Sequence, residues 1–236
     1  MILITRPEQK LAKSVAAFRL AGISCSGVAP LTITACKEEL GRLAHHLATQ
    51  PADYIIVTSA FAAQLLSALP LSALPSRWFA VGTSTAQVLE EYGLPVAVPE
   101  QQNSEGLLAL SQLNSANRRQ IVIIKGQGGR TTLRDTLLLQ QNHVEEFAVY
   151  QRLLLEKPIQ TDNWQWPQIT GIVATSGEMA EQLFRVYDTN MLRKQRWLTV
   201  SDRVAAQISA SGATQVAVCS DASDNTLCAW IKENWE

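Results

Sequence analysis

Short apolar runs alternate along the chain with longer runs in which apolar residues recur at helical spacing. Residues 2–5 predict a buried strand, and residues 8–21 predict a helix that stops at Gly22. Further predicted strands cover residues 54–57, 79–81, 96–98, 121–124, 171–174, 198–200 and 216–218. Most of them are followed by a helical run, such as 131–141 or the runs that end at Gly93 and Gly212. Strands that alternate with helices predict an α/β fold, with parallel sheets covered by helices on both faces.

The pattern repeats itself once. ILITR at 2–6 matches IVIIK at 121–125, DYIIVTS at 53–59 matches TGIVATS at 170–176, and WFAVG at 78–82 matches WLTVS at 197–201. The offset is long and nearly constant, whereas a solenoid has shorter and more numerous repeats. The repeat therefore predicts two copies of one small α/β domain.

Two segments do not fit within either copy. Residues 30–36 and 146–152 alternate apolar and polar side chains, and each follows the first strand and helix of its copy. A period of two predicts exposed strands. We expect residues 32–36 and 148–152 to cross side by side as hinge strands. One lobe would then contain residues 1–31 plus 153–236, and the other residues 37–147.

Composition excludes several classes of protein. The chain has 20 basic and 21 acidic residues, which argues against nucleic acid or an anionic membrane as the main partner. It shows no secretory leader and no apolar stretch near the roughly 20 residues of a membrane span. The four cysteines and three histidines lack metal-ligand spacing. We expect a soluble cytoplasmic protein without a metal.

The residues that end the predicted strands are mostly hydroxyls, glycines and cations. In open parallel sheets, ligands bind beyond the carboxyl ends of strands, where helix N-termini present free N–H groups. Such a set suits anions and lacks an evident pair of nucleophile and base. Facing loops of the two lobes would form a cleft. The candidate binding residues are Arg6, Thr58, Ser59, Gly82, Thr83, Ser84, Lys125, Gly126, Gly128, Gly129, Arg130, Thr175, Ser176, Ser201 and Arg203.

The sharpest local signal is the Lys-Gly-Gln-Gly-Gly-Arg turn at 125–130. Glycines let the backbone approach a ligand, and the flanking cations add charge-assisted hydrogen bonds. The turn matches neither a Walker A loop nor a dinucleotide fingerprint. It is equally compatible with a plain strand-to-helix turn. Likewise, the two Thr-Ser pairs are explained by helix capping alone, and Arg6 by a surface position before a helix-starting proline.

Tyr150 differs from the turn residues because it lies in a predicted hinge strand. It is either an ordinary strand aromatic or a phenol that donates a proton or hydrogen bond to a leaving oxygen. Arg152 shares its strand face.

The chain carries an ordered set of motifs: the opening ILITRP, the KGxGGR turn followed by a helix and VYQR at 149–152, VATSGEM at 173–179, VSDR at 200–203 and DASDNTL at 221–227. This set resembles the uroporphyrinogen-III synthase family. The likeness extends from Ile2 to about Trp230. No single motif is diagnostic, and the last three look most like the enterobacterial branch.

The resemblance implies two flavodoxin-like lobes joined by a two-stranded ladder. It also implies the reaction, in which hydroxymethylbilane, a linear tetrapyrrole with eight carboxylates, closes with inversion of ring D and loss of water. Neither a metal nor an organic cofactor is implied. The partners would be this substrate and, transiently, the enzyme that supplies it, and we expect a monomer.

The resemblance also assigns residues. It makes Tyr150 the group that assists departure of the hydroxyl, and it places Thr175 and Ser176 against the substrate. The turns at 58–59, 82–84 and 125–130 would bind acetate and propionate arms. Many relatives have a Gly-Pro-Thr type of turn where this chain has Ser201, Asp202 and Arg203, so the contact of that threonine would pass to Ser201 or be dispensable.

Two other functions fit the residues less well. A two-lobed protein that binds an anionic small molecule without chemistry would need the same cleft, but the missing secretion signal disfavours it. A phosphate-transferring or nucleotide-using enzyme is disfavoured by the missing P-loop and acidic metal cluster.

Overall fold

The computed structural model describes residues 1–71 and 74–235, which divide into two compact units. Unit 1 contains Met1–Ile33 and Leu153–Glu236, and unit 2 contains Thr34–Arg152. Unit 1 is therefore built from both ends of the chain, whereas unit 2 is one continuous segment. Within the described part of the chain, no helix is long and apolar enough to cross a bilayer.

Unit 1 is a parallel sheet with the order β10-β9-β8-β1-β2. Its strands are β1 (Ile2–Thr5), β2 (Cys25–Ala35), β8 (Gly171–Ala174), β9 (Arg196–Thr199) and β10 (Gln215–Val218). The second part of β7 (His143–Gln160), from Leu153 onward, also belongs to this unit. Its helices are α1 (Glu8–Leu20), α8 (Gly177–Val186), α9 (Thr189–Arg193), α10 (Asp202–Ala210) and α11 (Asp224–Asn234), with a 3₁₀ turn at Trp166–Gln168.

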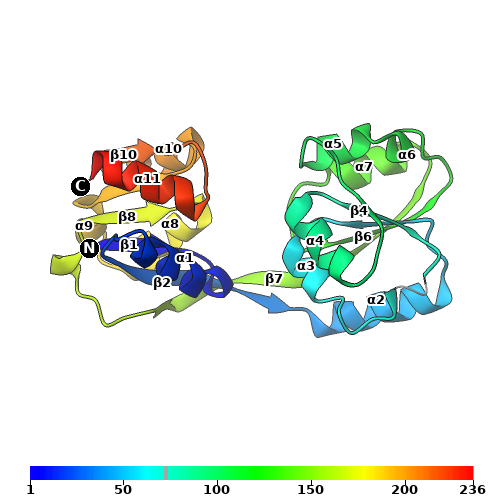
Figure 1. Cartoon of the computed structure of the whole chain (residues 1–236), viewed down its shortest axis with the longest axis horizontal. Helices are drawn as coiled ribbons and strands as arrows, with labels where there is room; N and C mark the ends of the chain where they lie inside the picture. The colour runs from blue at the N-terminus through cyan, green and yellow to red at the C-terminus, as the bar shows by residue number, and fades with distance from the viewer. Residues whose placement is uncertain (72–73, 236) are drawn as a thin grey trace. The chain divides into compact units, whose positions relative to one another are not determined.

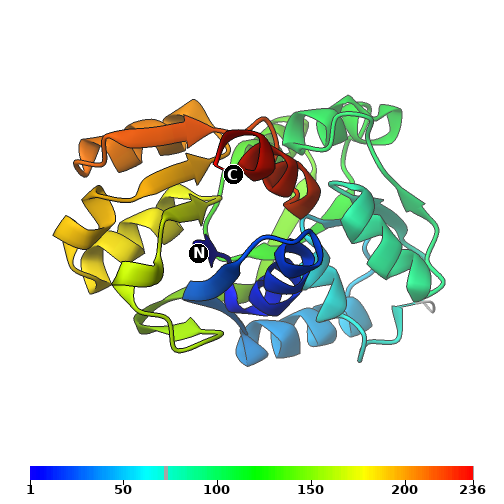
Figure 2. The same ribbon diagram turned by 60° about the vertical axis from the view of Figure 1, so that its left-hand side comes forward.

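The central strands β1 and β8 of unit 1 are almost wholly apolar and fully buried because both faces of the sheet are covered. Ile4 points into a cluster formed with α1 and α11, which includes Phe18 and Ile231. Its neighbour Leu3 points into the opposite cluster, formed with α8, α9 and α10 around Trp197. Successive side chains of a strand face opposite sides, so one short apolar run supplies both cores. Figure 2 shows the two sets of helices on either side of this sheet.

Unit 2 is a parallel sheet with the order β7-β6-β3-β4-β5. Its strands are β3 (Tyr54–Val57), β4 (Arg77–Ala80), β5 (Val96–Ala97), β6 (Gln120–Gly126) and the first part of β7 (His143–Gln160). Its helices are α2 (Lys37–Thr49), α3 (Ala60–Gln64), α4 (Thr83–Glu91), α5 (Ser104–Ala109), α6 (Ser111–Asn114) and α7 (Thr132–Leu139). One face packs against α5, α6 and α7, and α3 and α4 lie on the other side (Figure 1).

The two sheets have the same strand order once each is renumbered from its central strand. With β1 first in unit 1 and β6 first in unit 2, both read 2-1-3-4-5, which is the flavodoxin-like order. The predicted α/β class with two flavodoxin-like units is therefore confirmed. The predicted helix stops at Gly22, Gly93 and Gly212 are also confirmed, since these residues have φ of 83°, 77° and 98°.

The predicted crossing segments belong to longer strands than the alternation indicated. Residues 30–36 lie at the end of β2, and 146–152 lie within β7, which runs for 18 residues. The sequence gives no period of two beyond Arg152, because Leu153, Leu154 and Leu155 follow one another. The part of β7 beyond Arg152 was therefore not predicted as a strand.

Phe18 provides a test of the unit 1 core. Its side chain is fully buried, whereas Leu20 on the same helix is 89% exposed. Phe18→Ala should lower the free energy of unfolding by about 3–5 kcal/mol, because it removes a large side chain and leaves a cavity. Leu20→Ala should change it by less than about 0.5 kcal/mol. Urea unfolding followed by circular dichroism measures both. An equal loss of unfolding free energy in the two variants would contradict the place of Phe18 in the core.

Candidate functional site

A pocket of about 230 Å³ lies in unit 2 at the carboxyl ends of β6 and β3. These neighbouring strands send their helices to opposite faces: α7 joins α5 and α6, and α3 packs with α4. In open α/β sheets, this change of direction opens the crevice in which ligands bind. The pocket is lined by Thr58, Ser104, Ile123, Lys125, Gly126, Gln127, Gly128, Gly129, Arg130, Leu133, Glu146, Tyr150 and Arg152.

The glycine-rich turn forms one wall of the pocket. At Lys125 and Gly126 the pairing of β6 with β7 shifts by one residue, and the N–H of Gln127 then donates to the carbonyl of Tyr150 at 2.7 Å. Gly128 and Gly129 follow with φ of 75° and 85°, a left-handed conformation that favours glycine. Two successive glycines of this kind explain why the turn has this composition.

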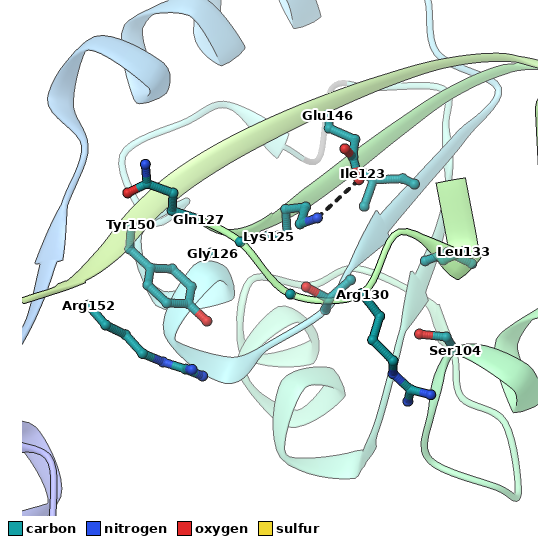
Figure 3. A pocket seen from close by; sticks show the side chains of 13 residues that line it. Ser104, Ile123, Lys125, Gly126, Gln127, Arg130, Leu133, Glu146, Tyr150 and Arg152 are labelled. Atoms are coloured by element: carbon teal, nitrogen blue, oxygen red, sulfur yellow. Dashed lines mark hydrogen bonds and ion pairs between the residues drawn. The ribbon is translucent and has the colours of Figure 1, made fainter. Parts of the chain in front are cut away.

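Tyr150 is held against this wall. A Cβ atom on Gly126 would overlap ring atoms Cζ and Cε2 and the hydroxyl oxygen of Tyr150, so the phenol occupies the space that glycine leaves. On another side the ring makes an edge-to-face contact with Phe61, with centroids 5.1 Å apart. The residue is only 8% exposed. Figure 3 shows its hydroxyl pointing into the pocket on the same side as the side chain of Arg152.

The predicted cations of the turn are both paired with carboxylates. Lys125 Nζ lies 3.2 Å from Glu146 Oε1, with both side chains largely buried. Arg130 Nη1 lies 2.8 Å from Glu105 Oε1 near the mouth, where both side chains are well exposed. An anionic ligand at either cation would have to compete with a carboxylate of the protein.

The other predicted residues of unit 2 lie outside this lining. Ser59 caps α3 by accepting from the N–H of Ala62, as the capping interpretation describes. Gly82 precedes α4, and the N–H of Thr83 donates to the side chain of Gln102. Ser84 lies in the first turn of α4. The structure therefore brings Thr58 together with the glycine-rich turn, and the 82–84 turn is not part of the lining of this pocket.

Arg6 in unit 1 is not the surface residue of the alternative interpretation. Its guanidinium is nearly buried and donates to Ser14 at 3.0 Å, Thr175 at 3.0 Å, the carbonyl of Ala222 at 2.9 Å and Asp224 at 2.6 Å. Ser14 in turn donates to Asp224. Arg6 thus ties β1 to α1, to the end of β8 and to the start of α11, with every guanidinium nitrogen engaged by protein atoms.

The remaining predicted residues of unit 1 are at helix starts. Thr175 accepts from Arg6, and Ser176 caps α8 by accepting from the N–H of Met179. Ser201 caps α10 in the same way, and Arg203 is exposed in its first turn. These contacts account for the residues structurally, and their roles toward a ligand stay predictions.

The prediction missed Glu146 as a pocket residue. It lies opposite Ile123 in the strand register and shares its face of β7 with Tyr150 and Arg152. The period of two from Tyr150 back to Glu146 was a signal that could have identified it. Ser104, the first residue of α5, also lines the pocket and was not among the candidate binding residues. Among residues 1–71 and 74–235, no group of three His, Cys, Asp or Glu side chains could hold a metal ion.

Comparison with known proteins identifies the family. The model of uroporphyrinogen-III synthase HemD matches residues 13–229. The chain belongs to the uroporphyrinogen-III synthase family. It is 31% identical over 240 aligned residues to the enzyme of Salmonella typhimurium, covering 96% of this chain and 97% of the relative. It is 28% identical, with the same coverage, to the enzyme of Escherichia coli.

Solved uroporphyrinogen-III synthases share the fold. The Helicobacter pylori structure has a TM-score of 0.65 at 13% identity and covers 99% of both chains. A mutant from Thermus thermophilus has a TM-score of 0.62 at 14% identity and covers 98% of both. Members of the family are cyclising lyases of tetrapyrrole biosynthesis, so the family supports the enzyme over the cofactorless binding protein.

Gly126 provides a test of how the pocket holds Tyr150. Gly126→Ala should displace the ring, lower stability by about 1–3 kcal/mol and slow synthase turnover by tenfold or more, because a shift of about 1 Å can cost roughly a hundredfold in rate. The matched control is Gly41→Ala in α2, where a Cβ meets nothing within 4 Å. Thermal denaturation and the turnover rate measure the effect. An active, equally stable Gly126→Ala variant would show that the close approach is unimportant.

Arg6 provides a test of the unit 1 network. Arg6→Met should cost about 2–3 kcal/mol of stability, because Asp224 then keeps its charge without its partner. Arg6→Met combined with Asp224→Asn should recover part of the loss. Arg185→Met, which removes an exposed cation of α8, is the control and should change stability little. Chemical denaturation measures all three, and no loss in Arg6→Met would contradict a structural role.

Proposed function

We propose that this chain cyclises hydroxymethylbilane to uroporphyrinogen III, with inversion of ring D and loss of water, at the pocket of unit 2. The observation that carries the proposal is the phenol of Tyr150, fixed by Gly126 and Phe61 in a polar pocket at the carboxyl ends of β6 and β3. Family membership supplies the reaction. The position and the polar lining of the pocket support it as the site of this reaction.

Tyr150 is the proposed proton donor. Its hydroxyl donates to the terminal hydroxyl of the bilane, which leaves as water and gives an electrophilic azafulvene. The substituted carbon of ring D attacks the azafulvene carbon that lost the hydroxyl, and a spiro-pyrrolenine forms. Fragmentation and rejoining then give the inverted macrocycle. Because the unaided bilane also closes, without inversion, the protein's main contribution is to position the two ends.

The rest of the pocket is proposed to bind carboxylates of the substrate. The glycine-rich turn offers backbone N–H groups at close approach, and Thr58 and Ser104 offer hydroxyls. Lys125, Arg130 and Arg152 supply positive charge around the phenol. A ligand with eight carboxylates needs many such donors, and this need explains a polar pocket in a protein of nearly neutral net charge.

Substrate contacts outside this pocket remain proposals from the family resemblance. They are Arg6, Thr175, Ser176, Ser201 and Arg203 in unit 1, and Ser59, Gly82, Thr83 and Ser84 in unit 2. Of these, Thr175 is favoured most, because Arg6 fixes the position of its hydroxyl oxygen. We also propose that the residues at 32–36 and 148–152 act as a hinge. A monomer working in the cytoplasm is proposed as well; its four cysteines are unpaired, as is usual in that compartment.

Tyr150→Phe is the sharpest test of the mechanism. It should slow formation of uroporphyrinogen III by at least about tenfold, toward the hundredfold or more typical of a lost general acid. Affinity for the product should be nearly unchanged, because the ring keeps its contacts. Tyr92→Phe is the control, since its exposed hydroxyl contacts the carbonyl of Gln64 outside the pocket. An unchanged rate in Tyr150→Phe would remove the phenol from the mechanism.

The activity itself is tested by an assay that supplies hydroxymethylbilane and resolves isomers I and III of the product. The wild-type chain should give isomer III faster than the bilane closes alone. Isomer I alone, at the spontaneous rate, would overturn the proposed function.

A further inference from the structure

The ion pair between Lys125 and Glu146 lies in the wall of the pocket, and the proposed function gives no role to Glu146. Glu146 faces the pocket from β7, and its Oε1 lies 3.2 Å from Lys125 Nζ. The side chains are only 15% and 22% exposed. Figure 3 shows the lysine extended toward the glutamate rather than toward the phenol of Tyr150. The most buried cation of the glycine-rich turn is therefore already engaged by a carboxylate of the protein.

Glu146 also contacts Arg134, but this second cation depends on it less. Arg134 Nη1 lies 3.4 Å from Glu146 Oε2, while Nε and Nη2 donate to Asp135 at 2.9 Å and 2.8 Å. The hydrogen bond and charge of Asp135 are the main causes that raise the pKa of Arg134. If the Glu146 carboxylate were absent, Arg134 would keep Asp135. Lys125 would keep no carboxylate within hydrogen-bond distance among the described residues.

The pair changes what an anionic ligand meets in the pocket. Charges act strongly on one another where solvent is largely excluded, so the Glu146 carboxylate cancels most of the attraction of Lys125 and repels an incoming carboxylate. A ligand carboxylate can bind Lys125 fully only by taking the place of Glu146. The free energy of the new ion pair is then offset by that of the one it replaces.

We propose that Glu146 competes with the substrate and product carboxylates for Lys125. It limits the affinity of the pocket for tetrapyrrole carboxylates, and its return to Lys125 assists release of the product. This inference rests on the proposed function, because it requires a carboxylate ligand in the pocket.

Glu146→Gln tests the proposal, since glutamine keeps the size of the side chain and removes its charge. Equilibrium binding of uroporphyrinogen III without oxygen should become tighter by about tenfold at low ionic strength. The gain should shrink at about 0.5 M salt, where screening is stronger. The KM for hydroxymethylbilane should fall in parallel. Unchanged or weaker binding at low salt would overturn the proposal.

Two further variants separate a competitive role from a general charge effect. In a Lys125→Met background, Glu146→Gln should give no tightening beyond that of a control, because the cation it would release is gone. Glu39→Gln is that control: it makes the same change in net charge, in unit 2, at a residue that pairs with Arg42 outside the pocket. Equal tightening with and without Lys125, or in Glu39→Gln, would overturn the proposal.

The same set of variants distinguishes this inference from the function on which it rests. If Lys125→Met weakens product binding and the wild-type chain makes isomer III, the proposed site holds whatever Glu146→Gln does. If Lys125→Met binds the product with the same affinity as wild type, Lys125 does not bind a ligand carboxylate. The proposed role of Lys125 and the proposed competition by Glu146 are then both wrong. If the thermal midpoint of Glu146→Gln is much lower than that of wild type, Glu146→Met replaces it. This variant should also bind the product more tightly, because it too removes the carboxylate.

Discussion

The structure depends on one constraint of parallel sheets. The helix that follows each strand must pack on one face of the sheet or on the other. In each unit a central strand and its neighbour send their helices to opposite faces: β1 and β8 in unit 1, β6 and β3 in unit 2. The carboxyl ends of these two strands are left without a helix packed directly across them. Side chains at that point decide whether the space is filled by the protein or left for a ligand.

The two units differ in what occupies the space at the carboxyl ends of these strands. In unit 1 Arg6 spans it, reaching Thr175 on one side and Asp224 at the start of α11 on the other. The repeat places Lys125 where Arg6 stands, but α5, at the position of α11, begins with Ser104 in place of an aspartate. The carboxylate that engages Lys125 comes from β7 instead, and a cavity remains. Two related sets of residues thus give a fixed scaffold in one unit and a polar pocket in the other.

Much of the fold was predictable because its signals are local. The four-residue strands β3 and β8 and the glycine stops of three helices follow from runs of apolar residues and from left-handed turns. The site was predictable only in part. The glycine-rich turn and Tyr150 carry their own signals, but the ion pairs do not. Arg6 and Asp224 are separated by 218 residues, and no pattern near either residue specifies the other. The length of β7 was missed for a related reason, since its second half lacks alternation.

The division of unit 1 between two parts of the chain has a consequence for synthesis. Domains usually fold as they emerge from the ribosome, with the N-terminal one first. Here the first 33 residues belong to a unit whose other strands begin only at Leu153. Residues 34–152 are contiguous and complete unit 2 earlier. The growing chain therefore has to carry β1, α1 and β2 through the synthesis of an entire unit before β8 and α11, which cover β1 and Phe18, are made. A nascent chain stalled near its middle would expose this segment to chaperones.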